Sequence, residues 1–258
     1  MTKASGKNWI LLRGLARESA HWGAFVPLLQ AAFPNAQITL LDLPGTGGLY
    51  REDSPTTIQA ITDNVRNQAQ AQGLTQQPVT LLALSLGAMV AWEWMRRYPD
   101  DICGAALMNT SFADLSPFYQ RLRWQSYKDF IALVMTHDVY QREAKILQLT
   151  GNRRDQDSQI IPAWEIIQTQ RPVSLKNSYR QIIAAASYKP GDIKPKQPVL
   201  LLNGGDDRLV SPACSAAIQK KWSLELCRHP WAGHDLTLDD GDWVVLQLKA
   251  WLTDFKVL

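Results

Sequence analysis

The sequence predicts an α/β protein with a six-stranded, mostly or wholly parallel sheet that has helices on both faces. Apolar runs of strand length, such as Val79 to Leu84, alternate with segments of helical periodicity, and this alternation is typical of parallel sheets. The alternation stops at residues 113–191, where helical patterns occur without a strong strand, and resumes at Val199. We therefore expect a core made of residues 1–112 and 192–258, with a helical insertion at 113–191 after the fourth strand.

The individual elements follow from apolar runs that are bounded by turn residues. Strands are expected at residues 8–13, 37–42, 79–84, 102–108, 199–203 and 224–228. Helices are expected at residues 20–33, 56–72, 86–97, 211–221 and 241–254. The helix after residue 85 is apolar on nearly every side, which indicates burial against the sheet, and Pro99 stops it.

Composition and charge exclude several classes of protein. At 258 residues, with 46% hydrophobic and 20% charged residues, the chain fits one domain with a sizeable core. No apolar run approaches the ~20 residues of a membrane-spanning helix, and residues 1–7 lack the apolar core of a signal peptide, so we expect a cytoplasmic protein without a membrane partner. The net charge of +3 is not gathered into a run and gives nucleic-acid binding no support. The three cysteines are widely spaced, which argues against disulfides and a metal site.

Ser85 stands where an apolar strand pattern breaks between small residues and continues as a helix. A serine hydroxyl is a weak nucleophile at neutral pH, so it needs exposure, a base and donors for an oxyanion. A sharp strand-to-helix turn lifts the side chain above the sheet and aims the Leu86 N–H at the reacting carbonyl. The stretch resembles the nucleophile elbow G-x-S-x-G of the α/β-hydrolase family, with Ala83 in place of the first glycine.

Polar residues follow two later strands, at the edge of a parallel sheet where the chemistry lies. After the strand at 199–203, Asp206 and Asp207 lie in a loop that is similar to the family's acid loop. In that loop an aspartate stands three residues past the glycine, and Asp207 has this position, with Asp206 as its competitor. After the last strand, an Ala-Gly-His run ends at His234, as in the family's histidine loop. The resemblance implies His234 as general base and Asp207 as its acid partner, in the chain order that this fold imposes on Ser85, Asp207 and His234.

The order of elements also looks like that of α/β-hydrolases, over nearly the whole chain apart from the insertion, which corresponds to the family's cap domain. Because only seven residues precede the first strand, the usual N-terminal hairpin is not expected. In the family the loop after the first strand usually reads His-Gly; here it reads Arg13-Gly14-Leu15. By position, the N–H groups of Leu15 and Leu86 are expected to form the oxyanion hole. Arg13 either holds this loop by hydrogen bonds or recognises a substrate carboxylate or phosphate.

Large apolar residues in the cap usually form a core, but some must face the site that a cap covers. The candidate substrate-binding residues are Arg13, Trp22, Trp124 and Trp164. The remaining histidines are interpreted as surface or hydrogen-bonded structural residues, namely His21, His137 and His229.

Together these residues predict a serine hydrolase that cleaves a small or medium acyl ester through an acyl-enzyme, without cofactor or metal. A thioesterase or a C–C bond hydrolase would use the same triad. A third possibility, from another class, is a binding protein that retains the triad but hardly turns over its small-molecule ligand. Dehalogenases and epoxide hydrolases are disfavoured, because those relatives carry an aspartate at the position of Ser85. The natural substrate and the oligomeric state stay open.

Overall fold

The computed structural model describes residues 7–254; the expectation of a missing signal peptide falls almost entirely on residues 1–6, outside the described part. The centre of the molecule is a sheet of six strands in the order β2-β1-β3-β4-β5-β6, and every neighbouring pair is parallel. The strands are β1 (Asn8–Leu12), β2 (Gln37–Leu41), β3 (Val79–Leu84), β4 (Ile102–Met108), β5 (Val199–Gly204) and β6 (Glu225–His229). The predicted parallel α/β sheet is confirmed.

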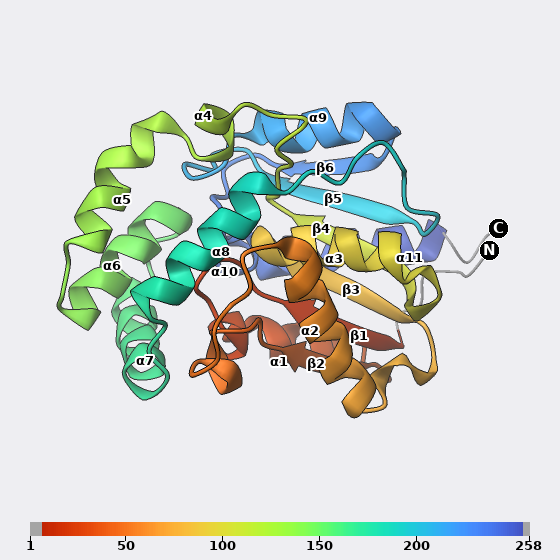
Figure 1. The fold of residues 1–258 in the computed structure, drawn as a ribbon, viewed down its shortest axis with the longest axis horizontal. Helices are drawn as coiled ribbons and strands as arrows, with labels where there is room; N and C mark the ends of the chain where they lie inside the picture. Colours follow the sequence, from red (N-terminus) through yellow and green to blue (C-terminus); the bar gives the residue numbers. More distant parts are fainter. Residues whose placement is uncertain (1–6, 255–258) are drawn as a thin grey trace.

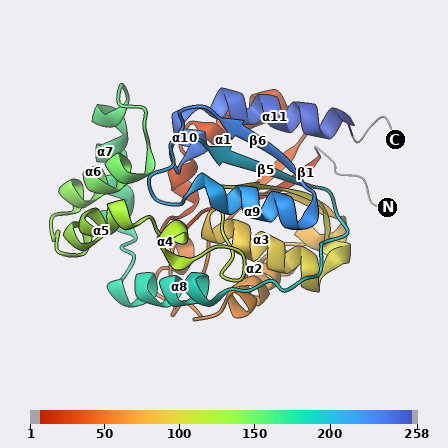
Figure 2. The ribbon, with the colours of Figure 1, turned by 90° about the horizontal axis from the view of Figure 1, so that it is seen from above.

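Helices cover both faces of this sheet (Figures 1 and 2). One face carries α1 (Phe25–Ala32) and α11 (Gly241–Asp254). The other carries α2 (Ile58–Ala71), α3 (Leu86–Arg97) and α9 (Pro212–Trp222). Because successive side chains of a strand point to opposite faces, Leu81 and Leu82 belong to two separate buried clusters. The sheet is therefore apolar on both sides, and its polar chemistry is confined to the strand ends.

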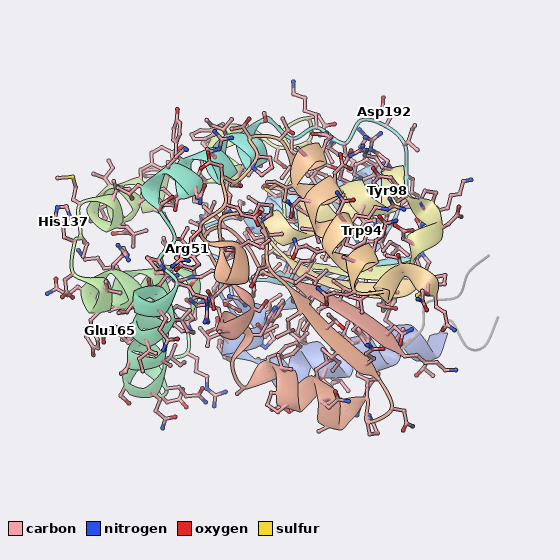
Figure 3. All side chains as sticks on the ribbon, turned by 60° about the horizontal axis from the view of Figure 1, so that its bottom comes forward. Arg51, Trp94, Tyr98, His137, Glu165 and Asp192 are labelled. Carbon is pink, nitrogen blue, oxygen red and sulfur yellow. The ribbon has the colours of Figure 1, made fainter. Side chains whose placement is uncertain are left out.

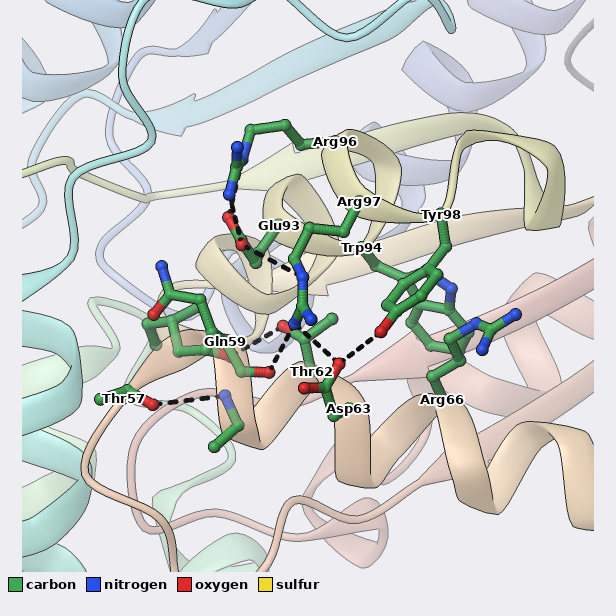
Figure 4. A network of polar contacts seen from close by, with 12 residues as sticks. Thr57, Gln59, Thr62, Asp63, Arg66, Glu93, Trp94, Arg96, Arg97 and Tyr98 are labelled. Atoms are coloured by element: carbon green, nitrogen blue, oxygen red, sulfur yellow. Dashed lines mark hydrogen bonds and ion pairs between the residues drawn. The ribbon is translucent and has the colours of Figure 1, made fainter.

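A polar network fixes α2 against the end of α3 (Figure 4). The Asp63 carboxylate accepts hydrogen bonds from Arg97 Nη1 and from the Tyr98 hydroxyl, each at 2.7 Å. Arg97 Nη1 also donates to the Gln59 carbonyl oxygen at 3.2 Å. These contacts hold α3, and therefore the turn that precedes it, in one position over the sheet.

The predicted helix at residues 20–33 is wrong in its first part. A 3₁₀ turn covers Ser19–Trp22, and α1 begins only at Phe25. Gly23 lies between them with φ 47° and ψ −130°, a conformation that is open to glycine but would strain other residues. This break lets the segment from Arg13 to Trp22, called the β1 loop below, stay at the sheet edge instead of joining the helix.

Between β4 and β5 the described chain forms helices and no strand. They are α4 (Phe118–Arg121), α5 (Tyr127–Val134), α6 (Val139–Thr150), α7 (Asp157–Gln170) and α8 (Leu175–Ser187). Figure 1 shows α5, α6 and α7 beside one end of the sheet. This is the carboxyl end, since Arg123 Nη1 donates to the carbonyl oxygen of Asp207, which follows β5, at 2.7 Å. In Figure 3, His137 and Glu165 lie on this insertion, on the opposite side of the molecule from Trp94 and Tyr98 of the α3 end.

Candidate active site

Ser85 occupies a strained turn between β3 and α3. Its backbone has φ 56° and ψ −114°, a conformation that residues with a side chain rarely adopt. Its N–H donates to the Met108 carbonyl oxygen at 2.8 Å, and its own carbonyl oxygen accepts from Thr110 Oγ1 at 3.0 Å. Within residues 79–95, Ser85 is the only one that is not buried. The turn therefore brings one hydroxyl group out of an otherwise buried strand and helix.

The end of β1 passes unusually close to this turn. A Cβ atom on Gly87 would lie 2.5 Å from the carbonyl oxygen of Arg13, and one on Gly14 would lie 3.2 Å from Ser85 Cβ. Small residues at 14 and 87 are thus required by backbone packing. The contact places the β1 loop, with Leu15 directly after Gly14, beside Ser85 and the first helical residue, Leu86. Backbone N–H groups from a helix N-terminus and an adjacent loop are the donors that an oxyanion hole needs.

Asp207 and His234 lie in contact at the ends of β5 and β6. Asp207 Oδ2 is 2.7 Å from His234 Nδ1, and both side chains are buried. The second carboxylate oxygen, Oδ1, accepts from the N–H groups of Leu209 at 2.8 Å and Val210 at 2.9 Å. With Nδ1 facing the carboxylate, Nε2 is the nitrogen that is left to act as a base. Asp206, the competing acid, is exposed.

Asn109, the residue after β4, connects these loops. Its Nδ2 donates to the carbonyl oxygens of Gly233 at 3.0 Å and His234 at 2.6 Å, and its Oδ1 accepts from the Gly204 N–H at 2.8 Å. The next residue, Thr110, holds the turn of Ser85. Sequence reasoning did not give Asn109 a role, because its only signal is a polar residue at the end of an apolar strand.

Arg13 pairs with Asp235, the residue after His234. Arg13 Nη2 lies 2.5 Å from Asp235 Oδ2 and Nη1 lies 3.4 Å from Oδ1, and both side chains are buried. Three strands separate β1 from β6, so the loop after β6 folds back over the sheet edge to make this pair. Burial alone would raise the pKa of Asp235, but the charge and hydrogen bonds of Arg13 bring it below its usual value. The guanidinium thus makes the hydrogen bonds expected of a residue that holds a loop.

The three candidate tryptophans have different surroundings. Trp22 is buried, with the Arg13 guanidinium carbon 4.9 Å from its ring centroid. Trp164 is also buried, with the guanidinium carbon of Arg17 4.5 Å from its ring centroid. Such contacts are attractive because the ring face is electron-rich. Trp124 is 64% exposed and lies on the surface of the insertion. Two of the three tryptophans therefore pack on arginines of the β1 loop.

Further ion pairs that sequence reasoning missed join the β1 loop to the insertion. Arg17 Nη1 lies 2.5 Å from Glu143 Oε2 of α6, and both side chains are buried. Glu18 accepts hydrogen bonds from Arg171, which follows α7. No sequence signal could have shown these pairs, because their partners are 126 and 153 positions apart. They fix the insertion to the loop that carries Leu15.

His21 is buried in the same region, against the ring of Trp164. Burial, and then the positive charges of Arg17 and Arg13, lower the pKa of His21 well below its usual value. His21 is therefore neutral at pH 7. It matches the expectation of a hydrogen-bonded structural histidine, since its Nδ1 accepts from the Glu18 N–H at 3.1 Å.

Comparison with known families decides the identity of this fold. The model of the alpha/beta hydrolase family matches residues 9–247. The chain belongs to the α/β-hydrolase family. A thermophilic esterase from Thermogutta terrifontis has a similar structure, with a TM-score of 0.73 and 19% identity over 98% of this chain and 92% of that one. The enol-lactonase from Burkholderia xenovorans LB400 is similar too, with a TM-score of 0.75 and 18% identity over 96% of this chain and 92% of that one. At such identities these α/β hydrolases show the fold alone.

A curated relative is monoacylglycerol lipase ABHD6 from Mus musculus, 25% identical over 118 residues, which are 44% of this chain and 34% of that protein. The matched part is thus about a third of the relative's length. Family membership supports a hydrolase and leaves the substrate open. In residues 7–254, no helix combines the length and apolar character needed to cross a membrane.

Proposed function

We propose that this α/β hydrolase is a serine hydrolase that cleaves small or medium acyl esters. The observation that carries the proposal is the hydrogen bond between Asp207 and His234, at the carboxyl end of the sheet where Ser85 lies partly exposed on a strained turn. The preference for esters is supported by the names of two similar proteins, an esterase and a monoacylglycerol lipase.

In the proposed first half-reaction, Ser85 Oγ attacks the acyl carbonyl carbon while its proton passes to His234 Nε2. The negative charge that develops on the carbonyl oxygen is stabilised by the N–H groups of Leu15 and Leu86. Asp207 keeps the imidazole in the correct tautomer and stabilises its charged form. The intermediate collapses to the Ser85 acyl ester, and His234 gives its proton to the departing alcohol.

In the second half-reaction a water molecule replaces the alcohol. His234 takes one proton from this water as its oxygen attacks the acyl-enzyme carbonyl. Collapse of the second intermediate breaks the bond to Ser85 Oγ, which receives the proton from His234. The products are the free acid and the unchanged enzyme.

We also propose that residues 113–191 act as a cap on a core of residues 1–112 and 192–258. The ion pairs between the β1 loop and the insertion support this role, since they hold helices next to the proposed oxyanion hole. Trp124 is too exposed to line a closed site, whereas Trp22 and Trp164 would shape it indirectly, through Arg13 and Arg17.

A fluorophosphonate probe tests the proposal, because it labels only an activated serine. Intact mass should show one adduct on the wild-type chain and none on Ser85→Ala. His234→Ala should abolish turnover of p-nitrophenyl esters, and Asp207→Asn should lower kcat by about 10⁴-fold. Asp206→Asn is the matched control and should be nearly unchanged. A folded wild-type chain that stays unlabelled would contradict the proposal.

The same assay separates the alternatives. Acyl esters and thioesters of equal chain length are compared, with Ser85→Ala as the blank. A kcat/KM that is higher for thioesters would identify a thioesterase. Labelling of Ser85 without turnover, together with a large ligand-induced rise in melting temperature, would indicate a binding protein that retains the triad.

A further inference from the structure

A pocket lies outside the proposed catalytic residues, between the start of α5, the end of α6 and the loop after β5. Its volume is about 360 Å³. This is within the range of pockets that hold small molecules. Its charged lining residues are Arg123, Lys145, Arg208 and Asp129. Three cations thus meet one carboxylate in a single hollow.

Within the described residues, none of the three cations forms an ion pair with a carboxylate. Lys145 Nζ donates to the Thr136 hydroxyl, and Arg208 Nη2 donates to the Gly151 carbonyl oxygen, each at 2.7 Å. Arg123 Nη1 donates to a backbone carbonyl oxygen too. By contrast, four other arginines of the insertion have carboxylate partners, namely Arg142, Arg153, Arg154 and Arg171, whereas Arg121 and Arg180 also donate to backbone carbonyl oxygens. What distinguishes the pocket is that three cations without an ion-pair partner line one hollow.

A further cation adds to this positive charge. Burial, and then the nearby charge of Arg154, lower the pKa of Arg208, and the opposite effect of Asp239, Asp129 and Asp207 offsets this only in part. An anion in the pocket would offset this repulsion. Guanidinium groups suit such a ligand, because their fork of N–H donors matches the oxygens of carboxylates and phosphates.

We propose that this pocket binds the carboxylate or phosphate group of a small molecule through Arg123, Lys145 and Arg208. The anion has two possible sources: the substrate of the proposed hydrolase, or a free anion that acts as an effector. Either occupant would contact the acid loop. Arg123 and Ser126 donate to the carbonyl oxygens of Asp207 and Arg208, each at 2.7 Å. A ligand that takes hydrogen bonds from Arg123 would therefore compete with the Asp207 carbonyl oxygen and change the position of the acid loop.

Inorganic pyrophosphate is the probe, and calorimetry at low ionic strength measures its affinity without any need for activity. Lys145→Gln and Arg208→Gln should each weaken binding by roughly 3- to 5-fold, as expected for one partly exposed charge. Asp129→Asn should tighten binding by roughly 2-fold, because it removes the only carboxylate of the lining. Added salt should weaken binding to the wild-type chain.

Lys128→Gln is the matched control. Lys128 is exposed on α5 but does not line the pocket, so its loss changes the net charge equally and should leave the affinity unchanged. The melting temperature of each variant shows that it is folded. Absence of binding, or equal weakening by Lys128→Gln and Lys145→Gln, would overturn the proposal.

Two kinetic arms distinguish the sources of the anion. If the substrate supplies it, Lys145→Gln should raise KM for a p-nitrophenyl ester whose acyl chain ends in a carboxylate, but not for the neutral ester of equal length. If a free anion is the ligand, pyrophosphate should change kcat for the neutral ester, and Lys145→Gln should raise the pyrophosphate concentration needed for half of this effect by roughly 3- to 5-fold. Should the esters not be hydrolysed at all, the calorimetry still decides on the pocket, so the two proposals fail independently.

Discussion

The insertion has two parts that differ in how they are held. The inner helices, α6 to α8, meet the core through buried charges, such as the pair between Glu143 and Arg17. The outer helices, α4 and α5, have no buried residue, and Ile131 and Met135 at the outer end are 65% and 70% exposed. The inner part is thus fixed by buried ion pairs with the β1 loop, whereas the outer part is held by hydrogen bonds to backbone carbonyl oxygens, such as those from Arg123 and Ser126 to the loop after β5.

This difference shows that buried ion pairs mainly determine the position of a helix and contribute less to its stability. A buried ion pair adds little net stability, but losing one partner is costly because the other charge is left without solvent. Such pairs therefore hold the inner helices in one arrangement next to the β1 loop. The outer helices have no such constraint, and α5 forms a wall of the pocket that we propose for anions.

The largest effect is expected where a buried pair of the inner helices is broken. Glu143→Gln should lower the free energy of unfolding by about 3 kcal/mol, because the buried Arg17 charge loses its partner. Urea unfolding measures this. Asp53→Asn is the matched control, since the pair of Asp53 with Lys176 also joins the insertion to the core but is exposed to solvent, and its loss should leave the free energy of unfolding nearly unchanged. Equal losses would remove the distinction between buried and exposed pairs.

Arg13 and Asp235 show whether the buried pairs also affect the chemistry. Asp235→Asn removes a negative charge from the residue next to His234 and should move the acid limb of the kcat/KM profile to lower pH. Arg13→Gln leaves the carboxylate of Asp235 without its cation and should move the limb to higher pH. The double variant should return toward the wild-type profile.

The profile is recorded with a neutral ester, so that no substrate charge contributes. Asp207 and Asp239 are further carboxylates that contact the His234 loop. Neither is substituted in any of these variants, so their charges contribute equally to each profile. Shifts of the two single variants in the same direction would mean that the pair acts only through structure.

A smaller effect is expected from His21 at the inner interface. Its lowered pKa in the folded chain means that, below about pH 6.5, the unfolded chain takes up the proton first. Above this pH, His21 therefore does not lower the free energy of unfolding. Below it, the proton that His21 binds in the unfolded chain lowers the free energy of unfolding, by at most about 1.4 kcal/mol per pH unit. Unfolding free energies between pH 7.5 and 5 should fall less steeply for His21→Gln than for the wild type. The exposed His137→Gln should keep the wild-type slope.

The smallest effect is expected on the outer helices. Ile131→Ala and Met135→Ala should change the free energy of unfolding by less than ~0.5 kcal/mol, because both side chains are already in water. Thermal unfolding of the two variants measures this. A loss above 2 kcal/mol for either would show that α5 is packed against another surface in solution.

The sequence was sufficient to locate the strands of the sheet and the loops that carry Ser85, Asp207 and His234. Apolar runs locate β3 to β5 because these strands are buried on both faces. Asp207 and His234 lie in contact as their motifs imply. The break at Gly23 was missed, since a glycine within a helical pattern does not reveal its own φ.

The partners of the β1 loop could not be predicted from the sequence. Arg13 and Arg17 have the same chemistry in the sequence, but one pairs with Asp235 and the other with Glu143. These contacts depend on how two distant loops meet in space. The three tryptophan candidates were equivalent in the sequence for the same reason, and only packing separates Trp124 from Trp164.

The pair of Arg13 with Asp235 joins residues that are 222 positions apart, and this has a consequence for synthesis. A ribosome makes the chain from its N-terminus, so the β1 loop and Ser85 emerge long before β6 and the loop that carries His234. Contacts of such long sequence separation form only after the chain between them is complete. In the proposed mechanism the nascent chain therefore has Ser85 without His234, and the proposed hydrolysis can begin only when the last part of the chain has folded over the sheet.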